Sequence, residues 1–501
     1  MHLQRIANVV GLLLVFVGIS MLLPAGIGFV FGDGDGPALL LSAGLTLGAG
    51  LTAYRTTRFD GDLNICEGYG IVAFAWAAIA LFGALPYLLT GSIPGLVPAV
   101  FESMSGFTTT GASVVTDIEA LPHGVLFWRS FTQWLGGMGI IVLAIAILPF
   151  LGVGGMQLFR AEVPGPTPER LRPRVTQTAK LLWAVYFGLT VVQTLLYLLG
   201  GMDLFDAVTH AFTTLSTGGF STRNASMAAF TSPYIQWVTI AFMYLAGINF
   251  ALHFRAAAGR FEYHRDVEWR FFTLLVLVVG FGVTTVNLVA GSGAGAAAGV
   301  EETLRGGFFQ VVSIVTTTGF VSQDYALWVP ASQVLLFALF FVGGMAGSTS
   351  GGVKTIRVLL ILKQTWMELR KHLHPKAVLL ARIGRHVVKE DVLANVIGFF
   401  VLYLLLAMAG TTALAFLGLD LLSAIGASIA SIGNIGPGWG AVGPVENYGG
   451  LGSPALGLLT FLMLVGRLEI YTVLLLLMPE TWRRVRRAHS ESPNRVVSPR
   501  E

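Results

Sequence analysis

Four short stretches rich in threonine, serine and glycine interrupt the apolar segments of this sequence at intervals of roughly 100–120 residues. They read FTTTGAS (107–113), LSTGGFST (215–222), VTTTGFVS (315–322) and SIGNIGPGWG (431–440). Each follows a segment of about 11–13 residues, which is too short to cross a bilayer, and long apolar segments lie on either side. The repeating unit is therefore a span, a half-length helix, a Thr/Gly turn and a second span.

The apolar segments of the chain predict an integral membrane protein. Only 12% of its 501 residues are charged, against about 25% in soluble proteins, and the mean hydropathy is +0.74. About ten apolar runs are candidate spans. These runs are Val9–Phe31, Leu39–Tyr54, Ile71–Leu89, Trp128–Val153, Leu181–Leu199, Ile235–His253, Phe271–Ala290, Val334–Gly344, Val392–Leu417 and Leu456–Met478.

The predicted fold is all-α, with four span–pore-helix–span repeats around a central pore and two extra N-terminal transmembrane helices. The expected boundaries follow the repeats. They are residues 1–66 for the extra helices, 67–156, 157–257, 258–375 and 376–482 for pore repeats 1 to 4, with a broken second span in repeat 3, and 483–501 for a basic tail.

The basic residues predict the orientation of the chain. Of its 31 lysines and arginines, 27 lie at the N-terminus, in alternate loops and in the tail. The positive-inside rule places both termini in the cytoplasm. This alternation explains the net charge of +4 better than a nucleic-acid partner does. Arg129, Arg223 and Arg305 are expected on the outer side, and Arg467 lies within a span.

The composition of the turns indicates cation binding. A half-helix that points into the membrane places its negative C-terminal end near the midplane. Backbone carbonyls in the following turn are tolerable there only if they line a cavity or bind something. Four such turns around an axis can replace the hydration shell of a cation. One Thr/Gly turn is commonly only a structural link between helices, but four in register predict a pore.

These motifs resemble the Trk/Ktr/HKT superfamily of cation transporters, and within it the chain is most similar to the TrkH-type pore subunits of bacterial Trk potassium uptake systems. The resemblance covers nearly the whole chain, and the two extra N-terminal helices favour the TrkH type. It implies potassium uptake across the bacterial inner membrane, through a selectivity filter that is the only expected metal site. The implied filter residues are Thr110, Gly111, Thr217, Gly218, Thr318, Gly319, Ile435 and Gly436, with Thr109, Ser216, Thr317 and Asn434 beside them.

The fourth turn departs from the threonine pattern, so the filter is expected to be asymmetric. Glycine at position 111 is similar to the potassium-permeable members of the superfamily. A sodium-coupled or sodium-permeable transporter of the Ktr or HKT type is the alternative. An alternating-access carrier is a further alternative, because such carriers also use broken helices.

A glycine-rich segment within the second span of repeat 3 is expected to break that helix, because glycine costs about 1 kcal/mol relative to alanine within a helix. By resemblance it is a gate below the filter, formed by Gly343, Gly344, Gly347, Ser348, Gly351 and Gly352. Packing of helices through small residues is the other interpretation. Arg467 resembles the arginine that the family places below the filter, where it would limit conduction; the alternative is an ion pair with Glu469.

No catalytic arrangement and no cofactor is expected in this chain. The resemblance implies a homodimer and a TrkA-like nucleotide-binding regulatory subunit in the cytoplasm. Glu102, Asp206 and Glu301 are expected either to cap helices or to concentrate cations at the pore mouth. Asn249 and His253 are expected to make ordinary polar contacts.

Overall fold

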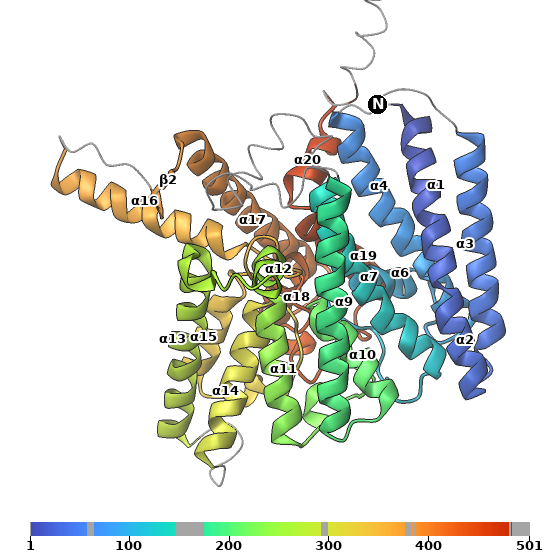
Figure 1. The fold of residues 1–501 in the computed structure, drawn as a ribbon, viewed down its shortest axis with the longest axis horizontal. Coiled ribbons are helices and arrows are strands. Elements are labelled where there is room, and N and C mark those ends of the chain that lie inside the picture. Colours follow the sequence, from blue (N-terminus) through green and yellow to red (C-terminus); the bar gives the residue numbers. More distant parts are fainter. Residues whose placement is uncertain are drawn as a thin grey trace, which may run out of the picture.

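The structure, a computed structural model, describes residues 2–57, 65–146, 175–291, 299–375, 382–384, 386–479 and Trp482. The predicted boundary at residue 156, the basic residues between 160 and 174, and the tail from 483 to 501 lie outside the described residues. Most helices run side by side along one direction, with the N-terminus, α16 and α20 towards one end of the molecule and the first turns of α10 and α14 towards the other (Figure 1).

Three helices precede the first repeat. They are α1 (Leu3–Ser20), α2 (Leu22–Phe31) and α3 (Gly36–Thr56). Glycines let α1 and α3 approach closely, since a Cβ atom on Gly11 would lie 2.7 Å from the amide nitrogen of Tyr54. Small residues at such contacts are typical of membrane helices, which associate through close packing. The two extra N-terminal spans are present as predicted.

Each of the four repeats contains a long first helix and a half-length helix. The first helices are α4 (Ile65–Gly83) with its continuation α5 (Leu85–Leu89), α9 (Val175–Leu199), α13 (Val267–Ala290) and α17 (Glu390–Phe416). The half-length helices are α6 (Leu96–Phe107), α10 (Leu204–Leu215), α14 (Val300–Val315) and α18 (Leu421–Gly433). Helix α14 has 16 residues, more than the 11–13 predicted.

The second span of the repeats is broken more often than the sequence predicts. Helix α7 (His123–Ala146) follows the first turn. In repeat 2 the chain bends by 103° between α11 (Pro233–Ala246) and α12 (Phe250–Ala257), and in repeat 4 by 117° between α19 (Ser453–Arg467) and α20 (Tyr471–Leu477). In repeat 3 the expected break separates α15 (Pro330–Leu339) from α16 (Thr355–Leu373).

Six described helices or helix pairs are long and apolar enough to cross a membrane, and eight if each bent pair is counted as one span. They correspond to eight of the ten predicted runs. Of the other two, the run from Trp128 lies on α7 and extends past the last described residue of that segment, and the run from Val334 contains the short helix α15. The chain is therefore a multi-pass membrane protein, as its apolar composition predicts.

The repeats close into a ring in the order 1–2–3–4. The second span of one repeat packs against the half-length helix of the next, namely α7 against α10, α11 against α14, and α19 against α6. Between repeats 3 and 4, the Trp439 ring packs against Phe337 and Phe340, with centroids 5.4 and 4.6 Å apart. One continuous hydrophobic core joins all four repeats.

Helix α16 extends away from the body of the molecule (Figure 1). A smaller core beneath its first turns joins it to α17 and to a two-stranded hairpin. The hairpin pairs β1 (Arg382–Ile383) with β2 (His386–Val387) in antiparallel register. Four short 3₁₀ helices complete the described structure: η1 (Ser226–Ala229), η2 (Tyr263–Arg265), η3 (Tyr325–Leu327) and η4 (Gly440–Val442).

Candidate functional site

The four turns that follow the half-length helices share one backbone geometry. After each helix a residue with a side chain takes a left-handed φ of 52° to 57°, and two residues later a glycine takes a φ of 77° to 95°. The first set is Thr109, Thr217, Thr317 and Asn434, and the glycines are Gly111, Gly219, Gly319 and Gly436. A left-handed conformation costs a residue with a side chain about 1–2 kcal/mol, so four at equivalent positions mark a functional constraint.

The structure corrects the sequence alignment of repeat 2 by one residue. The residue before each glycine donates its amide to the carbonyl five residues earlier, which is the bond from Thr110 to Ser105 in repeat 1 and from Gly218 to Thr213 in repeat 2, at 2.8 and 2.9 Å. The counterpart of Gly111 is therefore Gly219, and Gly218 occupies the position of Thr110. The predicted filter residue Thr217 takes the place of Thr109, and Ser216 that of Thr108.

The four turns meet around one axis, and each glycine faces the next turn. A Cβ atom added to any of these glycines would come closer than 3.0 Å to a carbonyl oxygen of a neighbouring turn. The pairs are Gly111 with Gly218, Gly219 with Thr318, Gly319 with Ile435, and Gly436 with Thr110. Because the last pair returns to the first repeat, the contacts form a closed ring. The ring sets one backbone carbonyl oxygen of each repeat against the glycine of a neighbouring turn. Carbonyl oxygens are the ligands with which membrane pores replace the water around a dehydrated cation.

The side chains of the ring differ between repeats. In turns 1 and 3, the two threonine hydroxyls on either side of the left-handed residue bond each other, Thr108 with Thr110 at 2.7 Å and Thr316 with Thr318 at 2.8 Å. In turn 4, Asn434 donates from Nδ2 to the hydroxyl of Thr110 at 2.9 Å. The ring is therefore asymmetric in its side chains, although its backbone is repeated.

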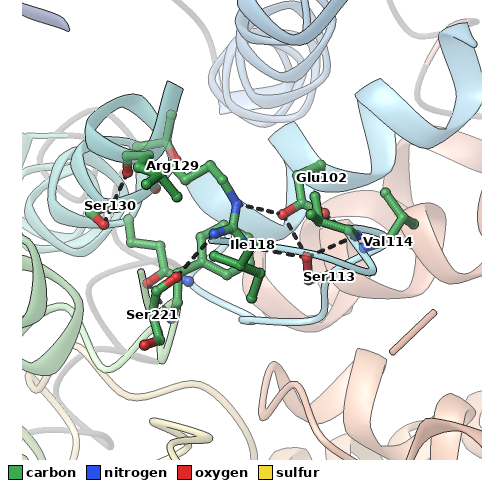
Figure 2. A network of polar contacts seen from close by, with 12 residues as sticks. Glu102, Ser113, Val114, Ile118, Arg129, Ser130 and Ser221 are labelled. Carbon is green, nitrogen blue, oxygen red and sulfur yellow. Dashed lines mark hydrogen bonds and ion pairs between the residues drawn. The ribbon is translucent and has the colours of Figure 1, made fainter. Parts of the chain in front are cut away.

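A buried ion pair holds the C-terminal end of turn 1 (Figure 2). Glu102 on α6 accepts from the amide of Val114 and from the hydroxyl of Ser113, both at 2.9 Å. Arg129 on α7 donates from Nε to Glu102 at 2.9 Å and from Nη1 to the carbonyl oxygen of Ser221 at 3.1 Å. Both charged side chains are at most 1% exposed. The pair therefore joins turn 1 to the C-terminal end of turn 2.

Each of the three arginines predicted on the outer side bonds a carboxylate of a half-length helix. Arg129 pairs with Glu102, Arg223 donates from Nε to Asp206 at 3.1 Å, and Arg305 donates from Nε to Glu301 at 2.9 Å. The sequence predicted that these carboxylates either cap helices or concentrate cations at the pore mouth. Neither describes Glu102, because it is buried and its bonds go to turn 1 and Arg129.

Two further half-helix side chains occupy the position of Glu102, nine residues before the ring glycine. His210 bonds the Ser221 hydroxyl through Nε2 at 2.9 Å, and Gln310 donates to the carbonyl oxygen of Gln323 at 3.1 Å. Both side chains are fully buried. Sequence reasoning missed them, although the shared spacing from the glycine would have identified them once repeat 2 was aligned correctly.

The glycine-rich segment between α15 and α16 lies directly against the ring, on the side where the half-length helices end. The Gly351 amide donates to the hydroxyl of Thr317 at 2.7 Å. The Thr349 hydroxyl donates to the carbonyl oxygens of Leu215 and Ala246, at 3.0 and 3.3 Å. The segment that contains the six predicted gate residues thus contacts repeats 2 and 3 beside their turns.

Arg467, at the end of α19, reaches this segment from repeat 4. Its Nη1 atom donates to the carbonyl oxygen of Thr349 at 2.9 Å, and the side chain is 5% exposed. Its Nε and Nη2 atoms have no hydrogen-bond partner among the described residues. The alternative of an ion pair with Glu469 is wrong, because the Glu469 carboxylate pairs with Arg357 at 3.0 Å.

Glu268, in the first turn of α13, joins the glycine-rich segment to the first turn of α16. Its Oε1 atom accepts from the amides of Ala346 and Ile356, at 2.9 and 3.0 Å, and the side chain is fully buried. The sequence interpretation missed this residue, since one acidic residue at a helix start is ordinary.

The two other polar residues singled out in repeat 2 have well-defined partners. His253 bonds the Tyr263 hydroxyl and the carbonyl oxygen of Leu245, both at 2.8 Å, as expected. Asn249 accepts from the amide of Ala251 at 2.9 Å and caps α12 at the bend of the second span. Phe250, next to it, donates its amide to the Gly347 carbonyl at 3.0 Å. In the described part of the chain no three His, Cys, Asp or Glu side chains gather as a metal site.

The chain is similar over most of its length to known proteins. Residues 45–483 match the TrkH family, described as cation transport protein. The chain is 43% identical over 495 residues to the Trk system potassium uptake protein TrkH of Halomonas elongata, covering 97% of this chain and all of that protein. It is 41% identical to the Escherichia coli K12 protein of the same name, covering 96% of this chain and all of the relative. The crystal structure of the potassium transporter TrkH from Vibrio parahaemolyticus matches 96% of this chain and all of its own, with a TM-score of 0.88 and 37% identity.

Proposed function

Because the chain belongs to the TrkH family of cation transport proteins, we propose that it takes up potassium across the bacterial inner membrane through the ring of four turns. The observation that carries the proposal is the closed set of contacts in which the glycine of each turn faces a carbonyl oxygen of the next. Backbone carbonyls held at fixed separations by a rigid ring can discriminate between cations of different size. The proposed filter comprises Thr109 to Gly111, Thr217 to Gly219, Thr317 to Gly319 and Asn434 to Gly436.

The proposal is tested on the purified protein by two measurements. In liposomes, flux of potassium is expected to exceed that of sodium. In detergent, potassium is expected to raise the thermal unfolding temperature more than equimolar sodium, because a ligand of the folded state stabilises it. The second measurement does not require an open pore. Equal stabilisation by the two ions together with equal fluxes would contradict potassium selectivity.

We propose further that the segment between Gly343 and Gly352 is a gate, with Arg467 as a fixed charge beside it. The bonds of Thr349 and Gly351 hold the segment against the turns, and Arg467 of repeat 4 holds the carbonyl of Thr349. A backbone with several glycines moves at little conformational cost. A buried guanidinium next to the path also repels cations strongly, because its charge is weakly screened there.

Arg467→Ala is expected to raise potassium flux on the order of tenfold, since a positive charge beside the path is removed. The preference for potassium over sodium is expected to stay unchanged, because the ring itself is intact. Flux into liposomes measures both quantities. Lys371→Ala, which removes an exposed cation of α16, is the matched control and should leave flux unchanged. Unchanged or reduced flux in folded Arg467→Ala would contradict the role of the charge.

We also propose that both termini lie in the cytoplasm and that a second copy of the chain and a nucleotide-binding regulatory subunit associate with the protein. The support for the orientation is the distribution of lysine and arginine. Helix α16 offers a surface for association, because four apolar side chains along it are more than half exposed. These are Leu362, Trp366, Leu369 and Leu373.

A further inference from the structure

The second turn of the ring lacks a side chain that turns 1 and 3 possess. Gly218 occupies the position of Thr110 and Thr318, whose hydroxyls bond Thr108 and Thr316 across the left-handed residue. In turn 2 the counterpart hydroxyl, that of Ser216, bonds the carbonyl oxygen of Thr213 at 3.2 Å instead. Two adjacent glycines also make turn 2 the most permissive backbone of the four.

The space that a side chain on Gly218 would fill is occupied by Gln133 of α7. A Cβ atom on Gly218 would lie 2.8 Å from Nε2 of Gln133 and closer still to Cδ and Oε1. The Gln133 side chain is fully buried. A side chain of repeat 1 thus stands where turns 1 and 3 carry their own threonine.

Two hydrogen bonds hold this carboxamide on either side of the ring glycine. Nε2 of Gln133 donates to the carbonyl oxygen of Gly218 at 2.7 Å, and Oε1 accepts from the amide of Phe220 at 3.0 Å. Because the Phe220 amide can only donate, it bonds the oxygen of the carboxamide, and the Nε2 end is therefore the one that donates to Gly218. Both bonds flank Gly219, and the carbonyl that is held is the one that faces Gly111 in the ring.

Among the described residues, only turn 2 has a side-chain amide that is hydrogen-bonded on both sides of its ring glycine. Gly136 of α7 and Gly466 of α19 are counterparts, because a Cβ atom on either would collide with the carbonyl oxygen four residues before the ring glycine, that of Phe107 or Ile432. Three residues before these glycines lie Gln133 in repeat 1 and Met463 in repeat 4. Because Met463 fills this position in repeat 4, the packing of the helix against the turn does not by itself require an amide.

We propose that Gln133 is a positioning residue of the ring, which supplies from repeat 1 the packing and hydrogen bonding that turn 2 lacks at Gly218. This inference rests on the proposed function, since Gln133 is expected to influence the cation preference of the ring. The carboxamide fixes the Gly218 carbonyl and the Phe220 amide, and so fixes the conformation of Gly219 between them.

Purified full-length variants in liposomes test this role through the ratio of potassium to sodium flux. Gln133→Ala is expected to lower the ratio roughly five- to tenfold, which corresponds to the net free energy of about one hydrogen bond. Gln133→Met retains the volume but not the hydrogen bonds, and it is expected to lower the ratio as well. Gln193→Ala, which removes a fully buried glutamine that bonds Tyr197 on α9, is the matched control and should leave the ratio unchanged.

The decisive variant combines two changes. Gly218→Thr alone is expected to reduce both the ratio and the thermal unfolding temperature, because its Cβ atom collides with Gln133. Adding Gln133→Ala provides the space, and the threonine can then bond Ser216 as in turns 1 and 3. The double variant is expected to recover most of the loss in unfolding temperature and in flux ratio relative to Gly218→Thr.

A double variant no better than Gly218→Thr, or a Gln133→Ala variant with the wild-type ratio, would overturn the inference. If Gly218→Thr yields folded protein only when Gln133→Ala is present, that rescue supports it. A wild-type protein without potassium preference would instead contradict the proposed function. The rescue of unfolding temperature would then still decide whether Gln133 occupies the place of the missing side chain.

Discussion

A protein carrying Gly219→Ala is expected to lose its preference for potassium over sodium, with potassium flux lower by on the order of tenfold or more. Two features of the structure cause this. Gly219 has a φ of 77°, which residues with a side chain rarely adopt, and its Cβ atom would collide with the Thr318 carbonyl oxygen of the next turn. Displacing that oxygen opens the ring, and each 1.4 kcal/mol of lost ion coordination corresponds to a factor of ten.

The matched control for this variant is Gly201→Ala, in the connection before α10. Gly201 has a φ of 89°, and a Cβ atom there would meet nothing within 4 Å. It therefore imposes the same backbone strain without an intrusion into the ring. Liposome flux of both ions, measured beside thermal unfolding, separates the two effects. If Gly219→Ala keeps the wild-type flux ratio, the ring of contacts does not set selectivity.

The second large effect is expected from the buried ion pair behind turn 1. Arg129→Ala leaves the Glu102 carboxylate buried without its cation, which typically costs about 3–5 kcal/mol. The thermal unfolding temperature is therefore expected to fall by several degrees, and the flux ratio to fall with it, because the pair holds Ser113 and Ser221 at the C-terminal ends of turns 1 and 2.

A double variant, Glu102→Gln with Arg129→Met, removes both charges and is expected to be more stable than Arg129→Ala, since no uncompensated charge remains. Lys371→Ala breaks an exposed pair with Glu368 and should change stability by less than about 1 kcal/mol. An unfolding temperature for Arg129→Ala equal to that of the exposed control would show that the buried pair contributes nothing to the stability of this region.

The repeat and its half-length helices could be predicted from sequence because length and apolarity directly limit what can span a bilayer. The bend in repeat 3 was also predictable, since five glycines lie between residues 343 and 352. The bend in repeat 4 could not be predicted. It occurs at Leu468, Glu469 and Ile470, none of which is a glycine or a proline, and the left-handed conformations of Glu469 and Ile470 are seen only in the structure. In repeat 2 the signal was weak, a single Asn249 that serves as a helix cap.

The position of the ring glycine in repeat 2 shows a different limit of sequence reasoning. The stretch LSTGGFST contains two adjacent glycines, and aligning the first of them with Gly111 is the simplest choice. Which of the two takes the left-handed conformation depends on where α10 ends and on the bond from Gly218 to Thr213. Sequence alone also does not show that Gln133 fills the space of the side chain that Gly218 lacks. The glutamine lies 85 residues away on another repeat, and the alignment of Gly218 with Thr110 comes only from the structure.

The ring built from one polypeptide has a consequence for how such a protein can change during evolution. In a pore assembled from four identical chains, every substitution appears four times around the axis. Here the polar ties differ at each of the four junctions. Gln133 and Arg129 act between repeats 1 and 2, and the Val321 amide donates to the Ser226 hydroxyl between repeats 2 and 3. The Tyr325 hydroxyl bonds Gly438 between repeats 3 and 4, and Asn434 bonds Thr110 between repeats 4 and 1. A single substitution therefore changes one quarter of the ring, and the contacts of the other three quarters keep their own side chains.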